Sequence, residues 1–553
     1  MSDGPDNSNN SNSNSNNDNK KKSSGFDFGR FARQLVDNAT FLAKHVIPTT
    51  LERELDADRV LRRTMGALIE TAAARYPIDP GAEWKPGNPL ELLLVGYSGT
   101  RNTGADVRVE EMIRQFRHLL GDDHLRLSIL TLDAKKTRGY FPGVRQLLAP
   151  KLFPKFMFDV VHQHHGVVAC EGSMFKSKFA NALTTFMVGA IGVATAEQKL
   201  AIGYGGEAGA MDPEVEAMVR KYCQRAIVIA RNPASVGVLK RLEIEASLGA
   251  DTAWTFEPHP PEVADALLKA AGWDGKKPVL VCCPINPFWW PVTADWKRGV
   301  EQAVFKSHSK NHFSSVYFHA GGEAIEAQQK AYVAALAGAL QHARETHDAF
   351  VVLVGMEALD RKAAEAIAKL MAEGSPSGLR STATSGEAPP LFISDQHEHR
   401  TLVSILRKAS ALLSSRYHAI VTAMPAGVPA VGVTMDERIR NLLGDAGLSE
   451  LCIEVSADDL RGKIEAGLAR IFADPTPIRT ALKKDVAHQL YLMGTMGQTF
   501  VEAIRRRHPA FPIREGLGRT GDVLAHLPSL SPELQALLVE FPPVPADAPE
   551  ILE

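Results

Sequence analysis

The chain repeats one pattern many times: an apolar run of strand length, a loop that often contains glycine, and a helix with regularly spaced apolar residues. The first series begins at LELLLVGYSG, continues through DVRVEEMIRQFRHLL and then reaches LRLSILTLD. A strand, a helix and a second strand in that order are the building block of a parallel sheet, because the helix carries the chain back to where it started. The repetition therefore predicts an α/β protein.

These runs fall into two groups. The first group spans residues 88–258, and the second spans residues 275–470. A chain of 553 residues is too long for one hydrophobic core, since a domain usually holds roughly 100–200 residues. We expect two Rossmann-like lobes facing a cleft, with ligands at the carboxyl ends of the strands. The second lobe should take its strands from PVLVCCPINPF, SVYFHAGGEA, AFVVLVGME, PPLFISDQH, ASALLSSRYHA and PAVGVTM.

The segments outside the lobes have different compositions. Residues 1–25 are rich in Asn and Ser and carry little apolar surface, which predicts a disordered tail. Residues 26–87 show helical spacing and then a Pro-rich linker, and residues 471–553 predict C-terminal helices followed by a Pro-rich tail. The N-terminus lacks the apolar stretch of a secretory signal, and no apolar run reaches the length of a membrane span.

Charge and cysteine content narrow the function classes. The net charge is −2, so no overall field favours nucleic acid or an anionic membrane. None of the five cysteines forms a C-x-x-C pair, which indicates reduced, buried thiols and a cytoplasmic protein.

The stretch GYSGTRNTGAD follows the first strand and opens the first helix of the first lobe. Its glycines, Gly96, Gly99 and Gly104, would let backbone N–H groups cradle an anion at the helix N-terminus. The spacing matches neither a dinucleotide-binding fingerprint nor a Walker loop. The alternative is a plain turn in which Asp106 caps the helix.

Further polar residues stand at other expected strand ends of the first lobe. Arg231 directly follows the strand AIVIA, where a planar guanidinium could hold a phosphate or carboxylate. The loop CEGSMFKSKFAN brings Glu171 and Ser173 to the end of FDVVHQHHGVVACEG. We read that run as one strand, with His162 and His164 on one face and a metal site only if another element adds a ligand.

The second lobe also carries polar residues at the ends of two expected strands. His319 and Glu323 follow the expected strand SVYF. Arg416 and His418 follow the strand ALLSS, at the start of a helix of small residues. An arginine offers a donor fork for an anion, and a histidine can give up a proton near neutral pH.

Three of these stretches resemble motifs of the polysaccharide pyruvyl transferase family. GYSGTRNTGAD resembles its G-Y-x-G-x-x-N-x-G-D-E loop, RNPAS its R-D-x-x-S element, and SSRYHAIVTAMPAGVP its S-R-[LFY]-H-x-x-x-x-A-x-x-x-G-[VI]-P element. The order also agrees over residues 90–455. Members of the family have two Rossmann-like lobes in a GT-B-like arrangement. They transfer the enolpyruvyl unit of phosphoenolpyruvate onto a sugar as a pyruvate ketal.

The resemblance implies roles for individual residues. Arg416 and His418 would bind phosphoenolpyruvate, Arg231 would hold its phosphate or carboxylate, and His418 would also donate a proton. The base for the sugar hydroxyl would be Asp106, Glu171 or Glu323, with Asp106 taken as the catalytic one. The further substrate contacts would be Gly99, Asn102, Gly104, Glu171, Ser173 and His319.

The same resemblance implies the partners. They are a small anionic donor and a saccharide acceptor, and no nucleic acid is expected. Phosphoenolpyruvate is a co-substrate, and the scheme requires no cofactor and no metal. It leaves room for peripheral association with a membrane-bound polysaccharide intermediate.

Two other functions remain open at this stage. A GT-B glycosyltransferase with a nucleotide-sugar donor would need a carboxylate for the ribose, for which Glu437 is the candidate. A non-catalytic anion-binding protein is the other alternative. Its support is the sequence Gly104-Ala105-Asp106, where the family has Gly-Asp-Glu.

Overall fold

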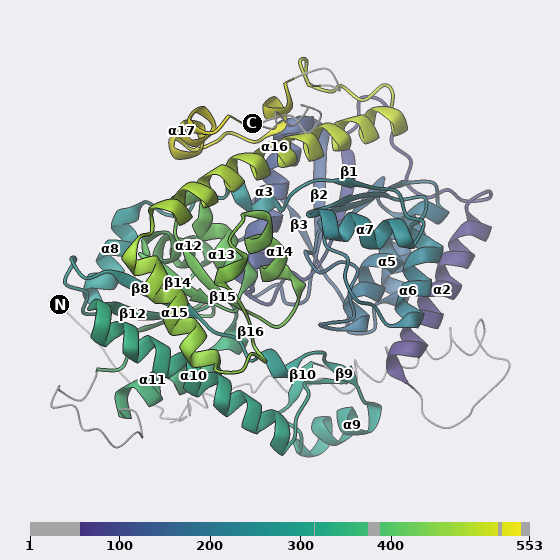
Figure 1. The fold of residues 1–553 in the computed structure, drawn as a ribbon. Coiled ribbons are helices and arrows are strands. Elements are labelled where there is room, and N and C mark those ends of the chain that lie inside the picture. The colour runs from purple at the N-terminus through teal and green to yellow at the C-terminus, as the bar shows by residue number, and fades with distance from the viewer. Residues whose placement is uncertain (1–55, 315, 374–386, 518–521, 543–553) are drawn as a thin grey trace, which may run out of the picture.

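The computed structural model describes residues 56–314, 316–373, 387–517 and 522–542. Figure 1 shows two sheets side by side, each covered by helices, with one long helix running across both. The predicted disordered tail and the first part of the predicted N-terminal helical region lie outside the described residues.

The first lobe is built on a sheet of seven parallel strands in the order β3-β2-β1-β4-β5-β6-β7. The strands are β1 (Leu90–Val95), β2 (Leu125–Thr131), β3 (Arg145–Leu148), β4 (Gly166–Ala169), β5 (Leu200–Gly206), β6 (Ile227–Ala230) and β7 (Ala246–Leu248). The helices of this lobe are α2 (Ala57–Arg75), α3 (Thr103–Leu120), α4 (Pro154–His162), α5 (Asn181–Ala196), α6 (Pro213–Cys223) and α7 (Pro233–Arg241). The central strands are buried on both faces, which explains their nearly continuous apolar sequences.

The second lobe has six parallel strands in the order β13-β12-β8-β14-β15-β16. The strands are β8 (Val279–Cys283), β12 (Phe350–Gly355), β13 (Leu391–Ile393), β14 (Ala411–Ser414), β15 (Ala430–Thr434) and β16 (Cys452–Glu454). The helices are α8 (Pro261–Ala270), α10 (Glu323–His347), α11 (Arg361–Glu373), α12 (His399–Lys408), α13 (Tyr417–Ala423), α14 (Glu437–Asp445) and α15 (Leu460–Ala473). The predicted fold class, two Rossmann-like lobes, is confirmed.

Both sheets reverse their strand order at an inner strand. In the first sheet the chain leaves β1 toward β2 and β3, and later returns to β4 on the other side of β1. In the second sheet β8 and β14 have the same relation. Such a switch point opens a crevice at the carboxyl ends of the two strands, where ligands of open α/β sheets bind. The topology therefore predicts that a ligand binds at the loops after β1, β4, β8 and β14.

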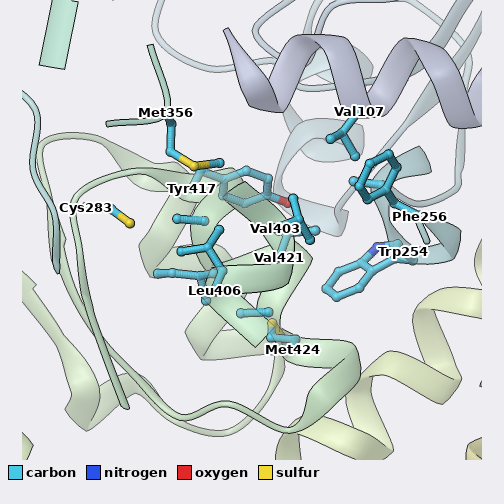
Figure 2. Packing of buried hydrophobic residues seen from close by; sticks show 14 of the residues in the cluster. Val107, Trp254, Phe256, Cys283, Met356, Val403, Leu406, Tyr417, Val421 and Met424 are labelled. Carbon is cyan, nitrogen blue, oxygen red and sulfur yellow. The ribbon is translucent and has the colours of Figure 1, made fainter. Parts of the chain in front are cut away.

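The lobes share one hydrophobic core. Figure 2 shows Val107 of α3 and the aromatic residues Trp254 and Phe256 beside Val403 of α12 and Val421 of α13. A second cluster fills the other side of the first sheet, where α2 packs on α5. There the glycines of α5 admit the neighbouring helix, because a Cβ on Gly189 would lie 2.6 Å from the Met65 side chain.

The helix α16 (Thr476–Arg507) connects the two lobes on one face of the molecule (Figure 1). Near its start, the Arg479 side chain lies beside the Gly427 turn of the second lobe. Near its end, the Phe500 ring stacks on Phe116 at 4.2 Å and meets Tyr204 edge-on at 5.8 Å, both in the first lobe. The described chain closes with the short α17 (Pro532–Glu540). Among the described helices, none combines the length and the apolar character needed to cross a bilayer.

The prediction of one strand over FDVVHQHHGVVACEG is wrong. Pro154 begins α4, which places Met157, Val160 and Val161 on one buried helical face and ends at His162. Only Gly166–Ala169 forms the strand, so the alternating faces expected for the histidines do not exist. His162 contacts Glu197 and Asp79, while His164 contacts Ser128 and His165 contacts the Glu91 backbone.

The prediction that SVYF joins the second parallel sheet is also wrong. Its strand, β11 (Tyr317–Phe318), lies in a separate antiparallel sheet with β9 (Thr293–Ala294) and β10 (His312–Ser314), next to α9 (Trp296–Phe305). An apolar run this short identifies a strand but carries no information about which sheet it joins.

The bridging role of α16 predicts a large effect of Phe500→Ala. Phe500 is fully buried, and removal of its ring leaves a cavity between α16 and the first lobe. We expect a loss of about 3–5 kcal/mol in the free energy of unfolding, measured by urea titration with tryptophan fluorescence. Arg506→Ala, at an exposed position of the same helix, should change it by less than about 0.5 kcal/mol. Equal effects would contradict the packing described for α16.

Candidate active site

A small cavity lies between the two lobes at the carboxyl ends of their strands. Its volume is about 50 Å³, several times the roughly 10–15 Å³ that one water molecule needs. The lining residues are Asn102, Gly104, Ala105, Glu171, Gly172, Ser173, Arg231, Met356, Arg416, Tyr417, His418 and Arg438. Three arginines and a histidine therefore surround one small space.

Strand ends of both sheets supply these residues. The loop after β1 leads into α3 with Asn102 as its N-cap, whose Oδ1 accepts a hydrogen bond from the Ala105 N–H at 3.2 Å. Glu171 follows β4, and Arg231 directly follows β6. In the second lobe, Arg416 is the N-cap of α13 after β14. The cavity thus lies at the switch point of the first sheet and reaches that of the second.

Asp251, in the loop after β7, is the centre of a buried charge network. Its carboxylate accepts hydrogen bonds from Arg108 Nε at 3.0 Å, Arg231 Nη1 at 2.9 Å and the Ala253 N–H at 3.0 Å, and His418 Nε2 lies 3.3 Å away. Burial opposes its ionisation, but the charges of Arg108 and Arg231 and the hydrogen bond with His418 outweigh burial and hold the pKa of Asp251 well below its usual range. One carboxylate therefore ties His418 of the second lobe to two arginines of the first.

The His418 imidazole packs against the N-terminus of α3. A Cβ on Gly104 would lie 2.2 Å from His418 Nδ1, so only glycine leaves room for the ring. Burial lowers the pKa of His418, and the Asp251 carboxylate only partly offsets that effect. The ring is therefore neutral at neutral pH in this structure, with Nε2 toward Asp251 and Nδ1 against a residue that lines the cavity.

Arg416 is held in place by two carboxylates of the second lobe. Its Nε donates to Asp360 Oδ2 at 2.9 Å, and its Nη2 donates to Asp360 Oδ1 and, at 3.3 Å, to Glu357 Oε2. Burial raises the pKa of Asp360 to about 6, although Arg416 opposes this rise. The pairing engages Nε and Nη2 and so fixes the plane of the guanidinium beside the cavity.

Arg231 and Arg438 complete the cationic lining. Arg231 donates through Nη2 to Glu207, and its guanidinium lies 4.1 Å from the centre of the Tyr417 ring. Arg438 donates through Nε to the Asp436 carboxylate, at 2.8 and 3.1 Å to its two oxygens. Like Arg416, each of these arginines is oriented by a carboxylate beside it.

Direct contacts between the lobes surround the cavity. Asn102 Nδ2 donates to Glu357 Oε2 at 3.0 Å, and Arg101 Nε donates to the Ser394 carbonyl at 2.8 Å. On another side, Lys176 Nζ lies 3.0 Å from Glu437 Oε1. These contacts close the cavity to its present size.

The structure brings most of the predicted site residues together. Those lining the cavity are Asn102, Gly104, Glu171, Ser173, Arg231, Arg416 and His418. Gly99 is not among them: it turns against β2 at φ +93°, where a Cβ would lie 2.3 Å from Thr131 Oγ1. His319 packs instead with Trp289, Trp290 and Phe313.

The carboxylates proposed as bases have three different environments. Glu171 lines the cavity. Asp106 is buried in the first turn of α3, outside the lining, and burial raises its pKa well above the usual range. Glu323 is exposed at the start of α10. Among the described residues, no three His, Cys, Asp or Glu side chains are placed to hold a metal ion.

Sequence reasoning missed several residues of the site. Asp251 follows a strand of only three residues, and Arg108 lies within α3 rather than at a strand end. Asp360 and Glu357 follow β12, a strand that is evident in the sequence, so its carboxyl end was the available signal. Arg438 lies in the first turn of α14, the helix that follows β15, so the carboxyl end of that strand was the available signal.

Comparison with family models identifies the central part of the chain. Residues 208–437 match the polysaccharide pyruvyl transferase family. The matched segment contains Arg231, Asp251 and His418 of the buried charge network, and also Arg416 beside the cavity. The predicted resemblance to this family is thereby confirmed, and with it the prediction of a transferase. The match supports an enzyme that modifies a polysaccharide.

Solved structures with a similar fold were also found. UDP-GlcNAc 2-epimerase from Neisseria meningitidis, bound to UDP-GlcNAc, is 12% identical, with 75% of this chain and 100% of that chain covered and a TM-score of 0.44. An O-GlcNAc transferase from Thermobaculum terrenum is 13% identical, with coverages of 81% and 78% and a TM-score of 0.39. The fold assignment rests on the sheets themselves. No curated protein matches the chain.

The tight contact between His418 and α3 predicts the effect of Gly104→Ala. The added methyl group would displace the imidazole from Asp251 and from its buried site, so the lowered pKa of His418 should rise toward its ordinary value. The pKa is measured by NMR titration of the histidine ring signals. The control is Gly237→Ala, a helical glycine with open space around it. An unchanged His418 pKa in Gly104→Ala would contradict the packing.

The shared carboxylate predicts a large effect of Asp251→Asn. This change leaves Arg108 and Arg231 buried without their common counter-ion, so we expect a loss of about 3–5 kcal/mol in the free energy of unfolding. The same substitution at Asp395, whose ion pair with Arg361 is largely exposed, should cost less than about 1 kcal/mol. Urea unfolding of both variants measures the difference, and similar losses would refute a central role for Asp251.

Proposed function

We propose that the protein transfers a pyruvyl group from phosphoenolpyruvate to a saccharide, or to a related hydroxylated acceptor, as a ketal. The observation that carries the proposal is the cavity in which Arg231, Arg416 and Arg438 converge on His418. The donor carries a carboxylate and a phosphate, and planar guanidinium groups bind both. The family match, which covers three of these four residues, supports the same assignment.

The reaction forms three bonds at the donor, one to hydrogen and two to oxygen, and breaks the donor's bond to phosphate and its C=C double bond. A proton adds to the methylene carbon of phosphoenolpyruvate, which makes the neighbouring carbon electron-poor. Two sugar hydroxyls form bonds to that carbon, while its bond to oxygen breaks and phosphate leaves with the electron pair. Of the two hydroxyl protons released, one replaces the proton given to the methylene carbon and the other leaves with phosphate. Fixed cationic groups would stabilise the departing phosphate.

His418 is the proposed proton donor. Its lowered pKa leaves it neutral before the donor binds, and the negative charge of phosphoenolpyruvate would raise that pKa and bring a proton onto the ring. The Asp251 carboxylate at Nε2 would stabilise the protonated imidazole, which leaves Nδ1 for transfer. Asp251 thus acts as a positioning residue.

Glu171 is the proposed base for the acceptor hydroxyl. It lines the cavity, whereas Asp106 does not. Asp106 is buried outside the lining, and burial raises the pKa of its carboxyl group well above the usual range. We therefore give the role predicted for Asp106 to Glu171.

The cellular setting belongs to the same proposal. The five cysteines are all free thiols, which agrees with a cytoplasmic protein. A saccharide acceptor attached to a membrane-bound intermediate would be reached peripherally. Phosphoenolpyruvate enters as a co-substrate, and the proposed steps involve no other cofactor.

The nucleotide-sugar alternative has less support. Glu437, the candidate for a ribose contact, pairs with Lys176, and its Oε1 lies beside Gly209.

The proposal predicts that phosphoenolpyruvate stabilises the protein through Arg416. A ligand that binds only the folded state raises the melting temperature, with a gain of about 2.7 kcal/mol at a concentration 100 times its Kd. We expect this rise in the wild type and in Arg440→Ala, an exposed arginine paired with Glu454, and none in Arg416→Ala. Each variant is compared with its own melting temperature without ligand.

The other outcomes separate the alternatives. A rise only with nucleotide sugars would move the protein to the glycosyltransferases. A rise with phosphoenolpyruvate but no phosphate release with any acceptor in a saccharide panel would favour the non-catalytic anion-binding protein.

A further inference from the structure

The loop after β8 carries a group of aromatic side chains that the proposed donor site does not use. Trp289 and Trp290 are both partly exposed, although the aromatic residues around them form a packed cluster. The His319 ring stacks on Trp289 with 4.8 Å between ring centres and meets Trp290 edge-on at 5.2 Å. Phe313 contacts both His319 and Trp290. We call Phe179, Trp289, Trp290, Phe313 and His319 the aromatic cluster.

The topology places this cluster beside the reacting groups. The strands β8 and β14 are neighbours in the second sheet, and the strand order reverses between them. The loop after β14 carries Arg416 and His418, while the loop after β8 carries the two tryptophans. Both loops therefore leave the same crevice of the sheet.

Contacts between side chains connect the cluster to the cavity itself. Arg438 lines the cavity, and its guanidinium lies 4.5 Å from the centre of the Phe179 ring. Phe179 in turn meets Trp290 edge-on at 5.4 Å, and its carbonyl accepts a hydrogen bond from the Val292 N–H at 2.9 Å. Since Phe179 belongs to the first lobe and Trp290 to the second, the cluster crosses the cleft next to the donor site.

Polar atoms without partners lie inside the cluster. Trp290 Nε1 and His319 Nε2 are buried and make no hydrogen bond within the described protein, and the same holds for Asn286 Nδ2 in the same loop. Buried polar groups normally have a partner, so unmatched ones call for a ligand or water. Aromatic faces combined with such groups suit a molecule that has apolar patches and hydroxyls.

We infer that the aromatic cluster is the binding site for a sugar ring of the acceptor. One face of a pyranose presents C–H groups that pack on an aromatic ring. Phe179, at one end of the cluster, contacts Arg438 of the cavity lining. The inference rests on the proposed function, because it names where the acceptor of that reaction binds.

The test measures sugar binding separately from donor binding. Wild type and variants are titrated calorimetrically with methyl glycosides of glucose, galactose, mannose and N-acetylglucosamine, and then with phosphoenolpyruvate. We expect at least one glycoside to bind the wild type, and Trp289→Leu to weaken that binding about tenfold. Trp289→Phe, which keeps an aromatic ring, should restore most of it.

Trp84→Leu is the matched control. Trp84 is also a partly exposed tryptophan, but it packs on His508 and Phe511, away from the cluster. Glycoside binding should be unchanged in this variant, and phosphoenolpyruvate binding should be unchanged in Trp289→Leu. If Trp289→Leu lost both ligands, Trp289→Phe would decide between a folding defect and a lost contact.

Two results distinguish failure of this inference from failure of the proposed function. Glycoside binding that is absent from the wild type, or unaffected in Trp289→Leu, while phosphoenolpyruvate still binds would overturn the acceptor site alone. Glycoside binding that depends on Trp289, without any phosphoenolpyruvate binding, would keep the sugar site and refute pyruvyl transfer.

Discussion

A single buried carboxylate, that of Asp251, fixes the relation between the two lobes at the cavity. It is shared by Arg108 and Arg231 from the first lobe and by His418 from the second. A buried ion is tolerated only when its charge and its hydrogen bonds are matched, and here each partner satisfies the others. The position of the imidazole therefore depends on the folding of both lobes.

The arginines around the cavity follow the same rule. Asp360 orients Arg416, Glu207 orients Arg231, and Asp436 orients Arg438. These carboxylates let cationic groups stay buried in the folded protein. They also remove rotamer freedom that a ligand would otherwise have to freeze, so these cationic groups are preorganised before anything binds. The same ion pairs would therefore serve both stability and the proposed donor binding.

The sequence predicted those parts of the molecule that depend on local pattern. Apolar runs followed by glycine loops identified both parallel sheets, and strand ends identified Arg231, Arg416 and His418. The same reasoning failed where spacing along the chain was ambiguous. Pro154 turned an expected strand into a helix, and a run of three apolar residues gave no sign that β11 belongs to a separate sheet.

Sequence patterns could not predict which residues contact one another across large distances along the chain. Asp251 follows a strand too short to recognise, and its importance comes from residues 20 and 167 positions away, Arg231 and His418. Asp106 illustrates the converse. Its place in a recognisable motif suggested a base, but the motif does not reveal that the carboxyl group is buried outside the cavity lining, where burial raises its pKa.

The position of Phe500 has a consequence for synthesis on the ribosome. Its ring covers Phe116 and Tyr204 of the first lobe, yet it follows the last strand of that lobe by about 250 residues, which take roughly 13–50 s to translate. During that time the first lobe has its strands but not its final covering helix. The nascent chain therefore exposes an aromatic surface that needs shielding, by a chaperone or by transient contacts, until almost the whole protein has been made.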